Sequence, residues 1–311
     1  MSEKSIRVFA SATVANVSCG FDVLGFAVDN PGDEAIVRIT NSNQVRITKI
    51  TGDEGRLPLD PNKNTVSATI IKMLADLKIN VGVDIELAKK MPLGSGLGSS
   101  AASSVAGIFA VNELLGKPLK NIELLPYAME GERLASGTAH ADNVAPALYG
   151  GFVLIRSYQP LDVISIPTPD DLYASIVHPH IEVETRDARS ILRKDIKLKD
   201  AIAQWGNVAG LVTGLIMSDY ELIGRSMHDH IVEPLRAILI PGFYEVKQAA
   251  MDAGALGGGI SGSGPSIFSL SKSLETAQKV GKAMANQFGT IGIESDLFVS
   301  KINAKGPIIL E

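Results

Sequence analysis

The chain has 311 residues, of which 45% are hydrophobic and 20% are charged, as is usual for a globular protein. A net charge of −5 disfavours nucleic acid as the main partner, because phosphate backbones bind basic surfaces. Cys19 is the only cysteine, which excludes an internal disulfide and favours a packed thiol in a reducing compartment. The uncharged stretches 91–112 and 253–271 are rich in Gly and Ser, so we expect no membrane span and a cytoplasmic protein.

The first half of the chain mixes predicted strands with predicted helices. Val37, Ile39, Val45 and Ile47 alternate with polar residues, which predicts a hairpin that turns at 41–43. Strict alternation also predicts a half-buried strand directly before the glycine-rich segment at 92–103. The elements expected here are strands over 6–9, 81–88 and 152–157, and helices over 64–79, 100–115 and 122–134.

The stretch 159–171 contains three prolines and no strong period, and we place a domain boundary there. Half-buried strands mixed with helices favour an α+β protein over a doubly wound parallel sheet. The apolar spacing around Trp205 indicates core packing or a dimer face. The later elements are expected to be strands over 173–177, 266–270 and 294–302, and helices over 188–192, 198–217, 243–253 and 274–288.

Residues 92–103, PLGSGLGSSAAS, join a predicted strand to a predicted helix. The first N–H groups of a helix have no intrahelical partner, and the helix dipole adds positive charge there, so such a junction binds anions. Gly94, Gly96 and Gly98 allow backbone amides to face a ligand, and Ser99 and Ser100 add hydroxyls. Phosphate is therefore the expected ligand.

Two known types of phosphate-binding loop, the Walker loop and the dinucleotide-binding loop, differ from this segment. The Walker pattern fails because no lysine follows. The spacing of Gly96, Gly98 and Ala101 fits the dinucleotide fingerprint, but Asp84 and Glu86 alternate along the preceding strand, which should be apolar on both faces. A second cluster, GGGISGSGPSIFSL at 257–270, is interpreted either as a backbone wall beside a ligand or as a bulged strand entry.

Three segments together resemble the GHMP small-molecule kinases: ASATVANVSCGFDVLG at 10–25, the loop at 92–103, and GGGISGSGPSIF at 257–268. HADNVAPALYGG at 140–151, Thr185 with Arg189, and EPLRAILIPGF at 233–243 are similar to the members that act on homoserine. The matched segments lie in order across nearly the whole chain.

The resemblance implies a two-domain α+β fold. Residues 1–160 would form an ATP-binding domain like the second domain of ribosomal protein S5, and residues 161–311 a ferredoxin-like domain that completes the substrate pocket. The implied reaction transfers the γ-phosphate of ATP, with Mg²⁺, to the side-chain hydroxyl of L-homoserine, giving O-phospho-L-homoserine on the way to threonine. Members are commonly homodimers.

The resemblance also implies roles for individual residues. Mg²⁺ prefers oxygen ligands, and Ser100 and Glu132 are the implied protein ligands. The loop amides should hold the β- and γ-phosphates. The expected ATP-binding residues are Asn64, Pro92, Leu93, Gly94, Ser95, Gly96, Leu97, Gly98, Ser99, Ser100, Ala101 and Ala102.

Homoserine is a zwitterion with a terminal hydroxyl, so its site must satisfy three groups. Arginine suits a carboxylate because its planar fork donates two parallel hydrogen bonds, and an ammonium group needs acceptors. Arg189 and Arg236, helped by Thr185, are the expected carboxylate site, and Asp22 and Asn16 the expected ammonium site. The remaining implied substrate residues are His140, which either touches the substrate or supports the loop, Asp142 and Gly262.

Asp142 and Asn143 are the expected catalytic residues beside the hydroxyl. Many superfamily members have a lysine where this chain has Thr13, beside an aspartate base. An amide is no stable base, so we predict direct in-line transfer with Asn143 orienting the hydroxyl, and Asp142 as base is the competing account. The alternatives are a kinase of the same superfamily for another small alcohol and a catalytically silent sensor, which the intact loop and Glu132 disfavour.

Overall fold

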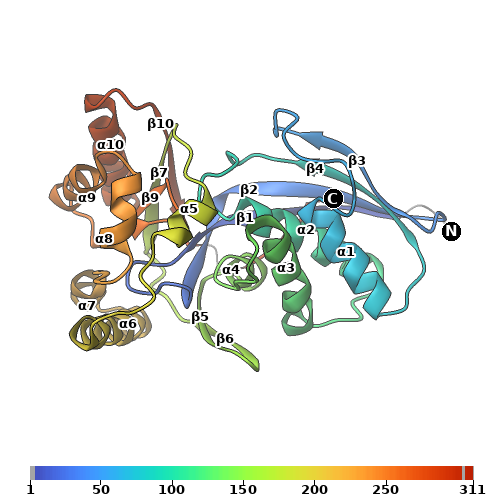
Figure 1. The fold of residues 1–311 in the computed structure, drawn as a ribbon, viewed down its shortest axis with the longest axis horizontal. Helices are drawn as coiled ribbons and strands as arrows, with labels where there is room; N and C mark the ends of the chain where they lie inside the picture. Colours follow the sequence, from blue (N-terminus) through green and yellow to red (C-terminus); the bar gives the residue numbers. More distant parts are fainter. Residues whose placement is uncertain (1–3, 303–304, 311) are drawn as a thin grey trace.

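The computed structural model describes residues 4–302 and 305–310, which build two adjacent β-sheets with helices packed against each (Figure 1). Within these residues the first sheet has seven strands in the order β11-β1-β2-β4-β3, extended by β5 on β2 and β6 on β5. Its strands are β1 (Ser5–Ala15), β2 (Leu24–Thr40), β3 (Val45–Thr51), β4 (Gly82–Ala88), β5 (Phe152–Tyr158), β6 (Leu161–Ile166) and β11 (Ile308–Ile309).

Strand β2 connects most of this sheet. It pairs antiparallel with β1 and β4, and its first residues, Leu24–Phe26, pair with β5. The predicted hairpin between β2 and β3 is wrong, because β4 lies between them and pairs with β3 in parallel. Val83, Ile85 and Leu87 of β4 are buried, which suits a central strand, whereas most positions of β3 are exposed and suit an edge.

Helices α1 (Thr65–Asp76), α2 (Ser99–Leu114) and α4 (Val144–Tyr149) pack on the first sheet, and α3 (Asn121–Ser136) packs against these three helices. Helix α2 lies against β1 and β2 and is flanked by α1 and α3. A helix enclosed in this way needs small or apolar residues on all faces, and α2 supplies Ala101, Ala102 and Ala106. The three helices predicted in the first half of the chain are confirmed, and α4 was not predicted.

The second sheet is antiparallel, in the order β10-β7-β9-β8, and α9 and α10 pack against it. Strand β8 is made by the start of the second glycine cluster and pairs with β9, so the cluster includes a strand that was not predicted. The elements are β7 (Tyr173–Pro179), β8 (Gly257–Ile260), β9 (Ile267–Ser271), β10 (Ser295–Lys301), α5 (Thr185–Ser190), α6 (Leu198–Met217), α7 (Tyr220–Ser226), α8 (Glu233–Arg236), a 3₁₀ turn (Ala237–Leu239), α9 (Phe243–Asp252) and α10 (Leu274–Thr290).

The proline-containing stretch 159–171 is not an unstructured linker. Strand β6 lies within it and forms an antiparallel pair with β5, and β11 near the C-terminus pairs with β1. Residues on the C-terminal side of position 160 therefore take part in the first sheet. The domain boundary at that position stays a prediction.

A single hydrophobic cluster extends between the two sheets. The ring of Phe26 on β2 stacks on Phe152 of β5 at 4.6 Å between centroids, and meets Phe268 of β9 edge-on at 5.7 Å. All three rings are fully buried. Such aromatic contacts contribute about 0.5–1.5 kcal/mol beyond their burial, so packed side chains join the two sheets. Within the described residues, no helix combines the length and apolar character that crossing a membrane requires.

Candidate active site

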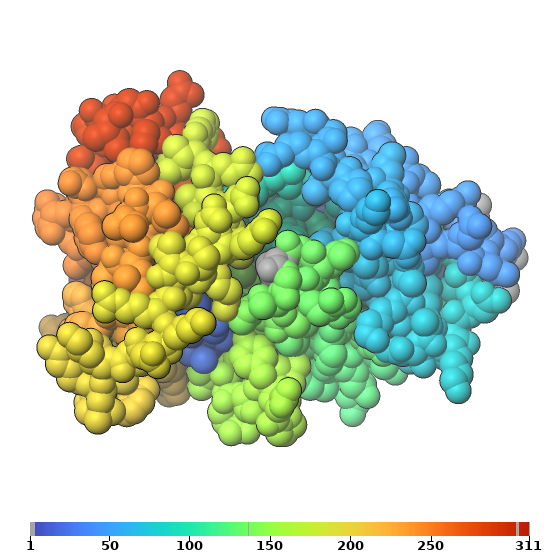
Figure 2. All heavy atoms as spheres, viewed as in Figure 1, coloured from blue at the N-terminus to red at the C-terminus, as the bar shows by residue number. Residues whose placement is uncertain are grey.

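A cavity of about 460 Å³ lies between the two sheets, within the range of about 300–1,000 Å³ that is usual for ligand sites. Figure 2 shows the molecule hollowed at the centre of this face, between the yellow segment near residues 185–200 and the green segment near 130–140. Loops after β1 and β4, the end of α3 and the starts of α5 and α4 supply the lining.

The predicted phosphate loop lies on the cavity wall between β4 and α2. Gly94, Gly96 and Gly98 have φ angles of +70°, +75° and +66°, which side chains other than glycine rarely adopt. A Cβ on Gly96 would lie 2.4 Å from the carbonyl oxygen of Ser261, whose own hydroxyl donates to the Gly96 carbonyl at 2.7 Å. Gly262 lines the cavity as well. The second glycine cluster therefore packs its backbone against the first and forms part of the wall.

The expected ATP-binding residues do not all face the cavity. The side chain of Asn64 caps α1, because its Oδ1 accepts from Val66 N at 3.2 Å and its Nδ2 donates to the Pro58 carbonyl at 3.0 Å. Its amide is thus already engaged at the cavity wall. Leu93, Gly94, Ser95, Gly96, Gly98, Ser99 and Ser100 line the cavity, whereas the side chains of Leu97, Ala101 and Ala102 belong to the hydrophobic core.

A buried ion pair supports the loop from below, and the sequence analysis did not find it. Lys89 bonds through Nζ to Asp33 of β2, to the Ser99 carbonyl at 2.9 Å and to Ser103 Oγ at 2.7 Å. Asp33 also accepts from Ser99 Oγ at 2.9 Å and from the backbone N of Lys90 at 2.8 Å. Burial lowers the pKa of Lys89, and Asp33 opposes that shift. Lys89 continues the alternation of β4 onto its buried face, a signal that would have revealed it.

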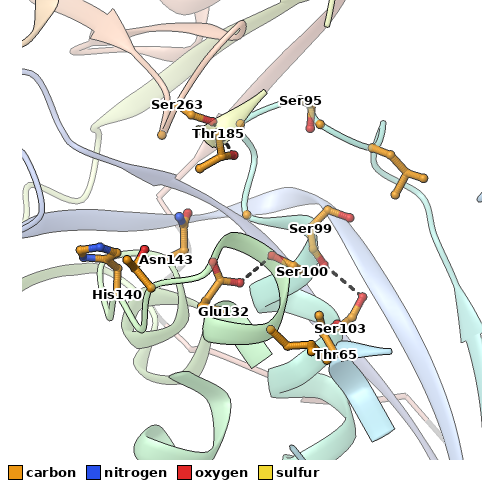
Figure 3. A pocket seen from close by; sticks show the side chains of 18 of the residues that line it. Thr65, Ser95, Ser99, Ser100, Ser103, Glu132, His140, Asn143, Thr185 and Ser263 are labelled. Atoms are coloured by element: carbon orange, nitrogen blue, oxygen red, sulfur yellow. Dashed lines mark hydrogen bonds between the residues drawn. The ribbon is translucent and has the colours of Figure 1, made fainter. Parts of the chain in front are cut away.

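Ser100 and Glu132, the predicted metal ligands, lie together. Ser100 Oγ donates to Glu132 Oε1 at 2.5 Å, and both side chains line the cavity (Figure 3). Burial raises the pKa of Glu132, while Ser100 and Lys89 oppose the rise. A hydroxyl and a carboxylate fit Mg²⁺, which takes one or two protein oxygens and completes its shell with phosphates and water. No group of three or more His, Cys, Asp or Glu suited to a metal occurs among the described residues.

The charged side chains expected to bind an amino acid form one cluster. Arg189 donates to Asp22 through both Nη atoms, at 2.9 and 3.3 Å, and Asp22 N donates to Asn16 Oδ1 at 2.8 Å. His140 Nδ1 lies 3.5 Å from Asp22 Oδ1, and burial lowers the pKa of His140. A zwitterion that bound between Asp22 and Arg189 would replace this ion pair with two others, one between its ammonium and Asp22 and one between its carboxylate and Arg189.

Arg236 and Thr185 complete the same wall. Arg236 is 3% exposed and donates to the carbonyls of Ala188 at 2.9 Å and Gly262 at 3.0 Å. Burial and the neighbouring Arg189 lower its pKa to about 10. Thr185 Oγ1 lies 3.1 Å from the hydroxyl oxygen of Ser263 across the cavity wall (Figure 3).

Two aromatic side chains that sequence reasoning missed hold this cluster in place. The ring of Phe21 lies under both guanidinium groups, 5.5 Å from Arg189 and 5.0 Å from Arg236, and so offsets the repulsion between two like charges. Tyr158 donates its hydroxyl to the Asp22 carbonyl at 2.9 Å and accepts from the backbone N of Ala141 at 3.3 Å. It thereby ties the Asp22 turn to the segment that precedes Asp142.

Asp142 and Asn143 lie on the floor of the cavity at the start of α4. Asp142 is 3% exposed, and burial, reinforced by the charges of Asp22 and Glu132, raises its pKa to about 7. Asn143 Oδ1 accepts a hydrogen bond from Thr13 Oγ1 at 2.8 Å. Both residues line the cavity that the phosphate loop also lines, so one ligand-sized space brings the predicted catalytic residues and the predicted phosphate-binding residues together.

Comparison with known proteins agrees with this geometry. The profile of the GHMP kinases N terminal domain matches residues 64–151, and that of the GHMP kinases C-terminal region matches residues 209–290. The chain belongs to the GHMP kinase family. A homoserine kinase of Chlorobium phaeobacteroides is 54% identical to this GHMP kinase over 99% of the chain and 100% of the relative, and one of Chloroherpeton thalassium is 55% identical over the same shares.

The solved structures extend the comparison. The crystal structure of homoserine kinase from Cytophaga hutchinsonii superposes with a TM-score of 0.97 at 65% identity, covering 100% of this chain and 98% of that one. A mevalonate kinase of L. major, 17% identical, shares the fold with a TM-score of 0.74 over 97% of each chain. The predicted two-domain α+β GHMP kinase fold is thus confirmed.

Proposed function

We propose that this GHMP kinase transfers the γ-phosphoryl group of ATP to the hydroxyl of L-homoserine and releases ADP and O-phospho-L-homoserine, a step toward threonine. The relatives named homoserine kinase, one of them 65% identical over the whole chain, support this activity. The observation that carries the proposal is that the Asp22–Arg189 pair, Arg236 and the phosphate loop line a single cavity. The cavity offers opposite charges for an amino acid beside an anion site for a nucleotide.

In the proposed complex the substrate binds between Asp22 and Arg189 and replaces the ion pair that they form with each other. Its carboxylate takes the guanidinium groups of Arg189 and Arg236, and its ammonium takes Asp22 and the Oδ1 of Asn16. Bidentate arginine–carboxylate pairing is among the strongest charged hydrogen bonds in proteins, so this exchange fixes the amino-acid end. Thr185 and His140 complete the enclosure. The side chain of homoserine is then directed toward Asp142 and Asn143.

The nucleotide is proposed to lie along the phosphate loop. The free N–H groups at the start of α2 and the backbone of Gly94 to Gly98 would hold the β- and γ-phosphates. Ser100 and Glu132 would hold Mg²⁺, which neutralises phosphate charge when bound. Lys89 has its ammonium bonded to Asp33 and the Ser99 carbonyl, so it fixes the loop from beneath.

The transfer is proposed to be direct and in line. The hydroxyl oxygen forms a bond to the γ-phosphorus as the bond to the ADP oxygen breaks, and the hydroxyl proton passes to the transferred phosphoryl group. Little nucleophilic activation is needed when the transition state is loose. Asn143 orients the hydroxyl and Asp142 binds nearby. If Asp142 were instead the base, D142N would lose the acidic limb of the pH–rate profile rather than lower the whole profile.

A parallel assay tests the proposed substrate. ADP release is measured with ATP, Mg²⁺ and homoserine, serine, threonine, mevalonate or shikimate. We expect turnover with homoserine to exceed that with the four others. Turnover of mevalonate or shikimate instead would leave the family unchanged and overturn the substrate. An absence of ADP release with all five would favour the catalytically silent sensor.

The molecule is further proposed to be a homodimer that pairs through α6. Trp205 is 61% exposed, so the core-packing interpretation of this residue is wrong. It belongs to α6, which lies at the edge of the molecule (Figure 1). This helix carries four other exposed apolar side chains, Leu198, Ile202, Ile216 and Met217. Trp205→Glu should then yield a monomer in sedimentation velocity, whereas Ile238→Glu, at a site outside α6 that is 79% exposed, should leave the dimer intact.

A further inference from the structure

Thr13 is fully buried on β1 and joins two parts of the proposed active site that are far apart in sequence. Its backbone N donates to the Leu97 carbonyl of the phosphate loop at 3.0 Å, and its hydroxyl donates to Asn143 Oδ1 at 2.8 Å. Thr13 therefore contacts the nucleotide side of the cavity with its main chain and the acceptor side with its side chain.

The shape of β1 allows Thr13 to contact both Leu97 and Asn143. The register between β1 and β2 shifts between Ser11 and Thr13, an irregularity of the kind that re-aims side chains beside active sites. Gly98 closes over the bond: a Cβ there would lie 2.0 Å from Thr13 Oγ1 and 2.8 Å from Asn143 Oδ1. The phosphate loop thus packs directly on the hydrogen bond between Thr13 and Asn143.

The direction of this bond determines what Asn143 offers to a ligand. A threonine hydroxyl has one hydrogen, and here Thr13 donates it to the amide oxygen. The amide NH₂ of Asn143, which carries only donors, is left for the cavity that Asn143 lines (Figure 3). The bond from Thr13 turns the Asn143 oxygen toward β1, so Nδ2 can donate to the attacking oxygen or to the phosphoryl group. An amide oxygen is too weak a base to take the hydroxyl proton.

We propose that Thr13 is a positioning residue for the phosphoryl transfer: it fixes the distance between the phosphate loop and Asn143, and it locks the Asn143 amide with NH₂ toward the reacting atoms. The inference rests on the proposed kinase function and deepens it. In-line transfer depends on sub-ångström placement, and a displacement of about 1 Å can cost about 100-fold in rate. The effect of losing Thr13 should therefore fall on turnover.

The first test removes the hydroxyl and keeps the shape. Thr13→Val should lower kcat about 10- to 100-fold while the KM values for homoserine and ATP change less than about threefold. Thr13→Ser, which restores the hydroxyl, should recover most of the turnover. Thr69→Val is the matched control, because Thr69 is equally buried but bonds only within α1, at 2.7 Å to the Val66 carbonyl. Wild-type kcat in Thr13→Val, or equal defects in the Val and Ser variants, would overturn the proposal.

The second test asks whether Thr13 acts through Asn143. In an Asn143→Ala background, adding Thr13→Val should change kcat less than about twofold, because the two side chains form one unit. Asn143→Asp distinguishes an Asn143 that presents its NH₂ group to the cavity as a donor from one that presents its oxygen as an acceptor. A donor role predicts a loss of more than about 100-fold, since a carboxylate would repel the phosphoryl group. Activity at or above that of wild type would show that Asn143 serves as an acceptor, and would overturn the proposed orientation.

A third measurement does not depend on which alcohol is the substrate. The side-chain amide ¹H–¹⁵N signals of Asn143 should shift in Thr13→Val and stay in place in Thr69→Val. Unchanged signals would refute the lock even in an active kinase. Conversely, shifted signals in a protein that fails to phosphorylate homoserine would refute the proposed substrate and leave the lock standing.

Discussion

Burial of the Asp142 carboxyl in the proposed active site should lower the free energy of unfolding of the ligand-free protein. The pKa of this carboxyl is raised from 3.8 to about 7 by burial and by the charges of Asp22 and Glu132. At about 1.4 kcal/mol for each pH unit, the ionised carboxylate destabilises the ligand-free protein by about 4 kcal/mol above pH 7. The sign follows from proton binding: between 3.8 and about 7 the native state holds the proton and the unfolded chain does not, so stability falls as pH rises.

Asp142→Asn removes this titration with little change in shape. In metal-free buffer the variant should be more stable than wild type, and its advantage should grow by about 2 kcal/mol between about pH 5.5 and pH 8.5. Urea unfolding followed by circular dichroism at both pH values measures this difference. Asp195→Asn, the same substitution at an exposed position, is the control. A variant that is less stable than wild type at the higher pH, or an advantage that is constant within about 0.5 kcal/mol, would refute the reasoning.

Three further substitutions probe the supports of the site. Lys89→Met leaves the buried carboxylate of Asp33 without its cation and should cost about 3–5 kcal/mol in urea unfolding, and a loss under about 1 kcal/mol would contradict the buried pair. Gly96→Ala should abolish most turnover because its Cβ would meet backbone at 2.4 Å, whereas Gly116→Ala, with similar φ but open surroundings, should retain activity. Phe21→Leu should raise the KM for homoserine about 3- to 10-fold with kcat nearly unchanged, and Phe21→Tyr should restore binding.

The parts of the fold that depend on local sequence were predictable. Helix α6 begins and ends at the predicted residues, and β4 and the glycine loop lie within a residue of their predicted bounds. Periodicity and glycine placement are properties of a short window, and a short window is sufficient to detect them. Cys19 illustrates the same point: it is packed as predicted, and burial raises its pKa to about 12.

The remaining features depend on partners distant in sequence. Nothing in residues 37–47 indicates that β4 will separate β2 from β3, because strand pairing depends on which segment offers the larger buried face. Lys89 and Asp33, 56 positions apart, meet only in the folded chain, as do Thr13 and Asn143. The family resemblance identified the groups that would touch ligand, and it did not identify the side chains that hold those groups.

The aromatic stack of Phe26, Phe152 and Phe268 has a consequence for how molecules reach the cavity. Swinging one half of the protein away from the other would pull three fully buried rings apart into water, at a cost of several kcal/mol, on the order of the stability of a whole domain. Entry of ligands then depends on the side chains around the opening of the cavity. Arg56 and Glu182 form an ion pair there at 2.9 Å, and an exposed pair of this kind is easily broken. We therefore expect the two sheets to stay packed together while short segments at the entrance move to admit and release ligands.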